Sequence, residues 1–227
     1  KTVNPPKLYD LTTLQREANR YYGFTAQQTL DLVQTLYEKK LLTYPRTDSQ
    51  FITDDMEDTA RQVISIVCRQ FPLFSGVLVT PDIARVTDNS NVTDHHAILP
   101  TVQLEKQDVS ALPQSEQKIL NLVGMRLLCA TGEKHTYAET QISLSCESYT
   151  FKTKGKTVVQ NGWKAIEELF KASLKTKEKD DPMKSLPEVH EGDVLDGVSA
   201  SVTEHFTTPP KQYTEDICCE RGIRNHP

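Results

Sequence analysis

The sequence predicts an α+β fold, with a mostly helical module over about residues 8–134 and a β-rich module over about residues 135–206. Two observations support this division. Before His135, helix-capping signals are followed by apolar residues at three-and-four spacing. After His135, apolar and polar residues alternate in the manner of strands. Residues 1–7 contain Pro5-Pro6 and are typical of an extended lead-in.

Two capping signals open the helical module. A capping box that begins at Thr12 predicts a helix up to about Tyr22, and Gly23 is suited to end it. A second capping box at Thr25 predicts another helix directly afterwards. This second helix places its apolar residues on one face: Leu30, Val33, Leu36 and Tyr37. The two helices followed by the Tyr44 stretch have a plan like that of a helix-turn-helix. For the two helices by themselves, an ordinary helical hairpin is the favoured explanation.

Two further helices follow in the same module. Thr53 is followed by four acidic residues in five positions, which by themselves would suit a metal cluster. A helix with Thr53 as its cap and acids in its first turn explains them more simply, because carboxylates stabilise a helix N-terminus. Residues 114–128 carry apolar residues at helical spacing and predict the last helix.

The β-rich module is predicted from alternation. Residues 140–146, 149–153 and 157–159 alternate as strands, with a turn at 154–156, and alternation resumes over 194–206. A short helical piece is expected around 163–166 and a mobile, lysine-rich loop over 171–186. The dense basic stripe is either a solvated hairpin or a DNA-facing edge: Lys152, Lys154 and Lys156.

Length and composition limit the classes of protein. A chain of 227 residues suffices for one large or two ordinary domains. The hydrophobic share is 37% and the mean hydropathy −0.50, with no long apolar run and no leader, so we expect a cytoplasmic protein without a membrane partner. Five cysteines without metal-ligand spacing also fit a reducing compartment. A start at Lys1 rather than Met suggests a piece of a longer chain.

The net charge of −5 argues against tight, unaided binding of DNA. A protein that holds nucleic acid through its phosphates usually presents a basic face. Any positive surface must therefore be local, with acids elsewhere, and we expect weak binding of single-stranded DNA that is lost as salt rises.

The stretch over residues 41–49 sets a phenol, a guanidinium and a carboxylate at alternate positions: Tyr44, Arg46 and Asp48. Pro45 favours an extended conformation at Tyr44, and residues two apart in an extended chain point the same way. A fixed cation beside a tyrosine stabilises both its phenolate and a phosphate under attack. The simpler alternative is a strand-edge tyrosine beside a surface turn.

Adjacent histidines, His95 and His96, are expected on a loop. They could be metal ligands, but neither Cys nor Glu lies at a supporting spacing, so no metal site is predicted. They could equally form a polar turn. A histidine near neutral pH can also donate a hydrogen bond to phosphate.

Several motifs together resemble those of type IA DNA topoisomerases. Residues 42–49, Leu-Thr-Tyr-Pro-Arg-Thr-Asp-Ser, resemble the active-site signature of that family. Residues 94–101 resemble its histidine motif in the form typical of the topoisomerase III branch. Residues 209–215 resemble the motif that opens its next DNA-binding region, and residues 11–15 resemble the start of the helical domain that bears the tyrosine.

The resemblance implies a reaction and a set of site residues. Tyr44 would attack a DNA phosphodiester and keep the 5′-phosphate as a phosphotyrosine, with Arg46 and His95 also catalytic. Because the bond energy is kept in this link, no nucleotide cofactor is needed. Asp48 would orient Arg46 or cap the following turn. DNA-binding roles are implied for Thr47, Asp48, His96, Tyr213 and Thr214.

The resemblance also implies an architecture. The helical module would be inserted into the β-rich hinge module, which residues 1–7 would join, while residues 207–227 would begin a further DNA-binding region. The family's acidic magnesium-binding domain, with an Asp-x-Asp-x-Glu run, has no counterpart in this sequence. We therefore expect magnesium and an N-terminal metal-binding domain in the parent protein, and an inactive fragment without them.

The principal alternative is a non-catalytic helix-turn-helix module that binds DNA or a protein partner. It explains the two N-terminal helices but leaves Tyr44-Pro45-Arg46 and His95-His96 without a role. A purely structural fragment fits the acidic charge and explains none of the motifs.

Overall fold

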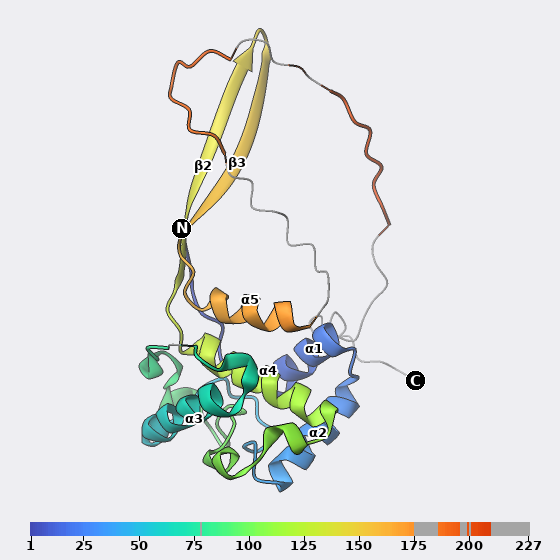
Figure 1. Ribbon diagram of the computed structural model, residues 1–227, viewed down its shortest axis with the longest axis vertical. Helices are drawn as coiled ribbons and strands as arrows, with labels where there is room; N and C mark the ends of the chain where they lie inside the picture. Colours follow the sequence, from blue (N-terminus) through green and yellow to red (C-terminus); the bar gives the residue numbers. More distant parts are fainter. Residues whose placement is uncertain (78, 175–185, 196–198, 200, 210–227) are drawn as a thin grey trace.

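A computed structural model describes residues 1–77, 79–174, 186–195, 199 and 201–209. A long β-hairpin rises from a helical body, and the N-terminus lies at the base of this hairpin (Figure 1). This arrangement is the α+β fold that the sequence predicts.

Five α-helices and three strands are present in the described part of the chain. The helices are α1 (Leu11–Tyr22), α2 (Ala26–Glu38), α3 (Glu57–Gln70), α4 (Gln114–Ala130) and α5 (Lys164–Ser173). The strands are β1 (Thr2–Val3), β2 (His135–Cys146) and β3 (Tyr149–Gln160). Short 3₁₀ turns connect α3 to α4 and precede α3: η1 (Asp54–Met56), η2 (Pro72–Phe74), η3 (Ile83–Val86), η4 (Asn89–Asn91), η5 (Val102–Lys106) and η6 (Val109–Ala111).

The caps of the first helices explain where each one begins. The predicted capping box of α2 is confirmed, since the Thr25 hydroxyl accepts from the Gln28 amide and the Gln28 side chain accepts from the Thr25 amide. The predicted cap of α1 at Thr12 is wrong. Asp10 caps it instead, through its carboxylate and the Thr13 amide. An aspartate and a threonine are both strong caps, and only the chain's path towards α1 decides between them.

The third helix begins differently from the prediction. Thr53 makes no side-chain capping hydrogen bond, and a 3₁₀ turn precedes α3. The Asn89 side chain accepts from the Asp54 amide instead. Glu57 and Asp58 do lie in the first turn of α3, where their charge suits the helix dipole.

Helix α4 is the centre of the helical body. Twelve of its residues are buried, and it contacts α1, α2, α3 and α5. A helix surrounded by others must be apolar on every side, which explains why its sequence shows only a weak polar face. The exposed faces of the other helices supply the charged surface.

The sheet has the order β1-β2-β3, and both pairs are antiparallel. Thr2 lies opposite Thr136, so β1 adds the lead-in to the base of the hairpin. Strand β3 is continuous through Gly155, which pairs with Thr140, so the predicted turn over 154–156 is wrong. The chain reverses instead after β2, where Glu147 adopts a positive φ of 51°. Pairing with β2 keeps the Lys-Gly-Lys segment extended.

Two other predictions after the hairpin are corrected. Helix α5 contains residues 164–166 of the predicted piece and continues to Ser173, so it takes up the first three residues of the predicted loop over 171–186. Residues 175–185 of that loop lie outside the described residues. The described residues of 194–206 form no strand. Alternation alone does not make a strand, because the backbone also needs a neighbouring edge to pair with. No helix in the described part of the chain is long and apolar enough to cross a membrane.

Candidate active site

The Tyr44 segment lies between the start of α1 and residues 97–101. Leu42 forms a bridge with Pro100, and the Thr43 amide donates to the Leu99 carbonyl at 2.9 Å. On the other side, the Leu11 amide donates to the Thr47 carbonyl at 3.1 Å. Both neighbours therefore fix the segment through its backbone, although it forms no regular strand.

Burial alternates along this segment. Pro45, Thr47 and Ser49 are buried, while Arg46 and Asp48 are exposed. This is the two-residue period of an extended chain. It places the guanidinium and the carboxylate on one outward face, although the chain bends at Pro45.

Tyr44 is held between two aromatic rings. Its ring centroid lies 5.4 Å from that of Tyr37 of α2, with an interplanar angle of 81°. The His95 ring centroid is 4.3 Å from that of Tyr44, with an angle of 40°. Tyr44 is half-buried, and Tyr37 and His95 retain solvent access. The structure thus brings together a phenol and an imidazole that are about fifty positions apart in the chain.

Hydroxyl groups of the Tyr44 segment hold residues 91–97, which carry His95 and His96 and are called the histidine loop below. Thr47 donates to the His95 carbonyl at 2.9 Å. Thr43 donates to the Ala97 carbonyl at 3.1 Å, and Ser49 donates to the Asn91 carbonyl at 2.7 Å. Three hydroxyls therefore tie the Tyr44 segment to the loop that carries His95.

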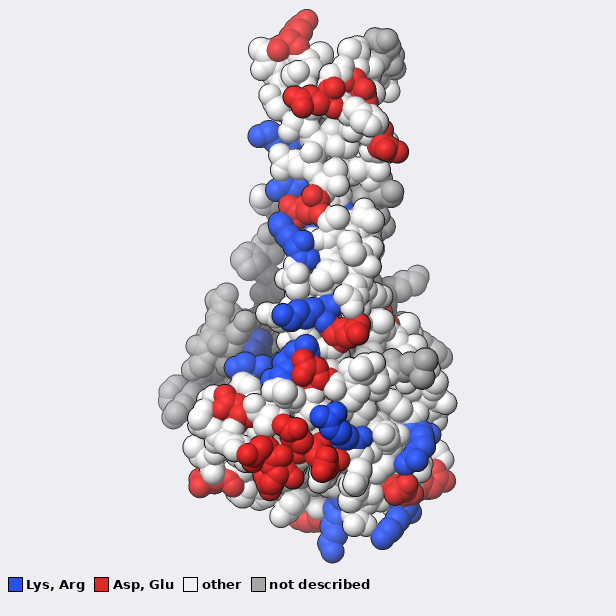
Figure 2. All heavy atoms as spheres, turned by 90° about the vertical axis from the view of Figure 1, so that its left-hand side faces the viewer, with Lys and Arg blue, Asp and Glu red and all other residues white. Residues whose placement is uncertain are grey.

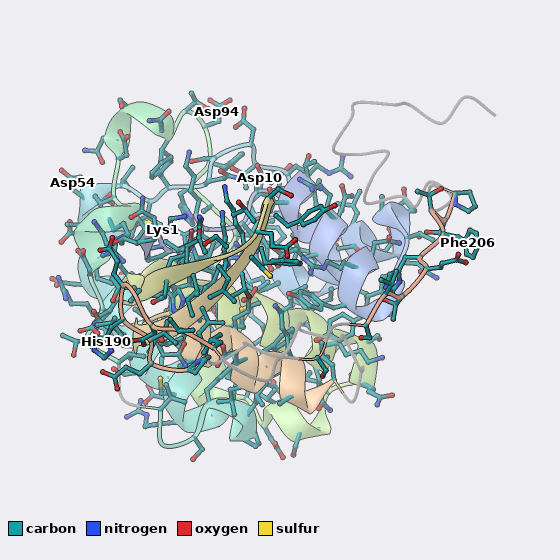
Figure 3. All side chains as sticks on the ribbon, turned by 90° about the horizontal axis from the view of Figure 1, so that it is seen from above. Lys1, Asp10, Asp54, Asp94, His190 and Phe206 are labelled. Carbon is teal, nitrogen blue, oxygen red and sulfur yellow. The ribbon has the colours of Figure 1, made fainter. Side chains whose placement is uncertain are left out.

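Arg46 and His95 share a pocket of about 460 Å³. Three carboxylates also line it, and two of these, Asp10 and Asp94, are labelled on the same side of the body in Figure 3. The complete lining is Asp10, Leu11, Thr12, Arg46, Thr47, Asp48, Thr93, Asp94 and His95. Tyr44 is not part of this lining and reaches the site through its contact with His95.

The residues with an implied DNA-binding role differ in their placement. Asp48 is exposed at the pocket, whereas Thr47 is buried and its hydroxyl also accepts from the Ser49 amide. DNA contact by Thr47 stays a prediction that its burial disfavours. His96 is half-buried, and its Nδ1 lies 2.8 Å from the Ala97 carbonyl. Tyr213 and Thr214 lie outside the described residues.

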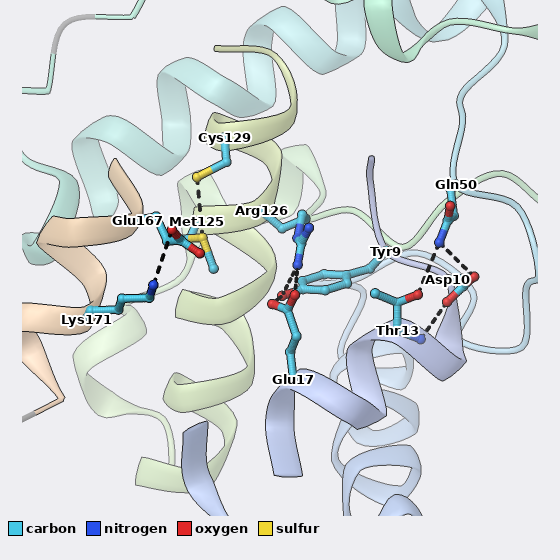
Figure 4. A network of polar contacts seen from close by, with 10 residues as sticks. All are labelled: Tyr9, Asp10, Thr13, Glu17, Gln50, Met125, Arg126, Cys129, Glu167 and Lys171. Carbon is cyan, nitrogen blue, oxygen red and sulfur yellow. Dashed lines mark hydrogen bonds and ion pairs between the residues drawn. The ribbon is translucent and has the colours of Figure 1, made fainter. Parts of the chain in front are cut away.

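A network of Tyr9, Glu17 and Arg126 lies in the helical body and connects to the site through the backbone of Tyr9 (Figure 4). The Tyr9 hydroxyl donates to Glu17, which also pairs with Arg126 of α4. The Arg126 guanidinium lies over the Tyr9 ring, 4.3 Å from its centroid. Burial raises the pKa of Tyr9 well above its usual value, so this phenol stays protonated. The Tyr9 carbonyl accepts from the Ile98 amide at 2.8 Å, which connects the network to the histidine loop.

A second contact joins the end of the Tyr44 segment to α1. The Gln50 amide donates to Asp10 at 3.0 Å and to Thr13 at 3.1 Å (Figure 4). Asp10 therefore caps α1 and fixes Gln50 at the same time. Sequence analysis missed this role and that of the buried network, because their members are scattered along the chain and follow no short motif.

Comparison with known proteins identifies the family of the chain. A sequence model described as DNA topoisomerase matches residues 1–217. The chain belongs to this DNA topoisomerase family. DNA topoisomerase 3 of Bacillus licheniformis is 36% identical over 92% of the chain, and that of Bacillus subtilis is 35% identical over 92%. DNA topoisomerase 3 of Staphylococcus saprophyticus is 34% identical over 95%.

The resemblance to type IA topoisomerases of the topoisomerase III branch is confirmed by these relatives. This topoisomerase chain spans 29% of the length of each of them. The full-length topoisomerase I structure from Thermotoga maritima is 24% identical and has a TM-score of 0.58 over 83% of the chain and 30% of its own. That likeness supports the fold.

The described part of this topoisomerase chain contains no group of three or more His, Cys, Asp or Glu side chains placed to hold a metal ion. The three carboxylates of the pocket form no such group. The acids after Thr53 form no such group either.

Proposed function

We propose that this chain supplies the nucleophile of a type IA DNA topoisomerase, which cleaves and rejoins one DNA strand to change DNA topology. The observation that supports this most is the contact between the Tyr44 and His95 rings, beside a pocket onto which Arg46 opens. A structural tyrosine would not need an exposed arginine and histidine at its side. The single strand that is cut, a metal-binding domain elsewhere in the parent and a cytoplasmic location belong to this proposal.

The proposed reaction is a reversible transesterification. The Tyr44 oxygen attacks phosphorus, the bond to the 3′-oxygen breaks, and the 5′-phosphate remains on Tyr44. The phenol proton is released, and the departing 3′-oxygen takes one up. Arg46 would stabilise the charge on the phosphoryl oxygens through its planar donors, and His95 would hydrogen-bond the same group. Attack by the 3′-hydroxyl on the phosphotyrosine reverses each step.

The helix-turn-helix alternative is weakened by the first turn of α2. A recognition helix reads bases with free side chains near its N-terminus. Here Gln27 donates to Asp31, and Gln28 closes the capping box with Thr25. These amides already have partners within the helix.

The test uses the parent protein that contains this chain, with magnesium and single-stranded DNA labelled at its 3′ end. Wild type should give a labelled covalent adduct on a denaturing gel, and Tyr44→Phe should give none. Tyr37→Phe is the matched control, since it removes the hydroxyl of the adjacent ring and should keep the adduct. An adduct that survives Tyr44→Phe would refute the assignment of the nucleophile.

A further inference from the structure

The β2–β3 hairpin carries a basic face that the proposed cleavage reaction does not use. Lys152, Lys154 and Lys156 alternate along β3, so their side chains project from one face of the hairpin. All three are exposed. Figure 2 shows Lys and Arg side chains following one another along the hairpin, with Asp and Glu side chains among them and near its tip.

The cross-strand partners leave most of this charge uncompensated. Lys156 lies opposite Glu139, but Lys154 lies opposite Gln141 and Lys152 opposite Ser143. A solvated hairpin would commonly pair its lysines with acids across the strands. Glu139 itself forms an ion pair with Lys1 at 2.6 Å, and that contact and the nearby lysines lower its pKa. No ion pair to the three β3 lysines occurs among the described residues.

The spacing of the lysines suits a phosphate backbone. Residues two apart in a strand lie about 7 Å from each other. This is about twice the rise of 3.4 Å per phosphate along one strand of B-form DNA. Gln141 and Ser143 add neutral hydrogen-bond donors on the same face.

The same face lacks a platform for unstacked bases. Single-strand binders combine positive charge with exposed aromatic rings. Tyr137 is the aromatic residue in register with this face, and the Lys156 ammonium already lies over its ring at 5.1 Å. Tyr149 and Phe151 project from the opposite face, because they are an odd number of positions from the lysines. Charge without stacking favours duplex DNA, which carries a higher density of phosphates.

We propose that this face of the hairpin, defined by Lys152, Lys154 and Lys156, binds the phosphate backbone of duplex DNA. At about 3.4 Å per residue, Lys156 and Lys152 lie roughly 14 and 27 Å along β3 from Gln160 at the base of the hairpin, so the face lies on the hairpin and not on the helical body that carries Tyr44. The surface would hold a duplex segment while a single strand occupies the Tyr44 site. Its binding does not depend on Tyr44 being the nucleophile.

An acidic segment, residues 186–191, lies beside part of this face and shares a pocket with Gln141, Ser143 and Lys156. The pocket has a volume of about 530 Å³, and the segment includes Glu188 and Glu191. These carboxylates make no ion pair with the stripe in the described part of the chain. Their negative charge repels phosphate, so neutralising Glu188 and Glu191 should tighten duplex binding.

The test measures duplex and single-strand binding by the 227-residue chain at several salt concentrations, without magnesium. Changing all three lysines to Gln should reduce the slope of log affinity against log salt by about 2.7 on a duplex, at about 0.9 per phosphate contact. Between 50 and 200 mM salt, wild type should lose about 40-fold more affinity than the variant. The matched control is Arg61→Gln, Arg69→Gln and Lys106→Gln on the α3–η5 side, which removes the same charge.

Three outcomes would overturn the proposal. An unchanged duplex slope in the triple lysine variant would exclude this face as the binding surface. An equal fall of the slope in the control variant would show that only the net charge of the chain matters. An equal or larger fall on single-stranded DNA would show that the face binds single strands instead. Because Tyr44→Phe leaves this measurement intact, failure here is distinguishable from failure of the proposed reaction.

Discussion

Removing the Thr47 hydroxyl should loosen the histidine loop without creating a cavity. Thr47 is 8% exposed, and its hydroxyl donates to the His95 carbonyl at 2.9 Å and accepts from the Ser49 amide at 3.1 Å. Thr47→Val replaces the hydroxyl by a methyl group of similar size. It leaves one carbonyl and one amide without this partner, and two net hydrogen bonds amount to about 1–3 kcal/mol.

The assay is urea denaturation of the 227-residue chain, followed by circular dichroism. At about 2 kcal/mol, the melting temperature should also fall by roughly 4–8 °C for a chain of this size. Thr47→Ser is the matched control, because it keeps the hydroxyl and should remain within about 1 kcal/mol of wild type. The reasoning fails if Thr47→Val and Thr47→Ser lower the free energy of unfolding equally, or if Thr47→Val lowers it by less than about 0.5 kcal/mol.

Three further substitutions test the supporting structure. Arg126→Met should destabilise the chain by about 3 kcal/mol in urea denaturation, because it strands the Glu17 carboxylate, and adding Glu17→Gln should restore part of that loss. Hydrogen bonds from neighbouring side chains lower the pKa of Asp88 below its usual 3.8, so its stabilising effect is present above that pH and is lost as the pH falls through the lower folded value. Asp88→Asn should therefore flatten the acid limb of a stability profile below pH 4. Gly162→Ala should lower the melting temperature more than Gly23→Ala does. Both glycines have positive φ, but a Cβ at Gly162 would lie 2.4 Å from a backbone carbonyl oxygen, while nothing lies within 4 Å of a Cβ at Gly23.

Local signals in the sequence predicted those features that local chemistry decides. The box of Thr25 and Gln28 is complete within four residues, and the structure forms it as predicted. The alternation around Arg46 and Asp48 likewise needs only an extended backbone. Helix α4 was found because its length and apolar content allow little else.

Features that depend on distant partners could not be predicted in this way. Gly155 stays within β3 because Thr140 pairs with it, although Lys-Gly-Lys alone favours a turn. Residues 194–206 alternate, but their described part has no neighbouring strand to bond. The network of Tyr9, Glu17 and Arg126 joins positions more than a hundred residues apart, and no short pattern announces it.

The distance in sequence between the Tyr44 segment and the histidine loop explains why the reactive residues could be predicted from sequence but the anchoring residues could not. The even positions of the segment carry the reactive groups, which are those of Tyr44, Arg46 and Asp48. The odd positions hold the segment in place: Thr43, Thr47 and Ser49 donate to three carbonyls of the histidine loop. In an extended chain, a shift by one residue exchanges the two faces. A one-residue insertion within the segment would thus bury reactive groups and expose anchors, so the spacing of the hydroxyls constrains the site as firmly as the identity of the tyrosine.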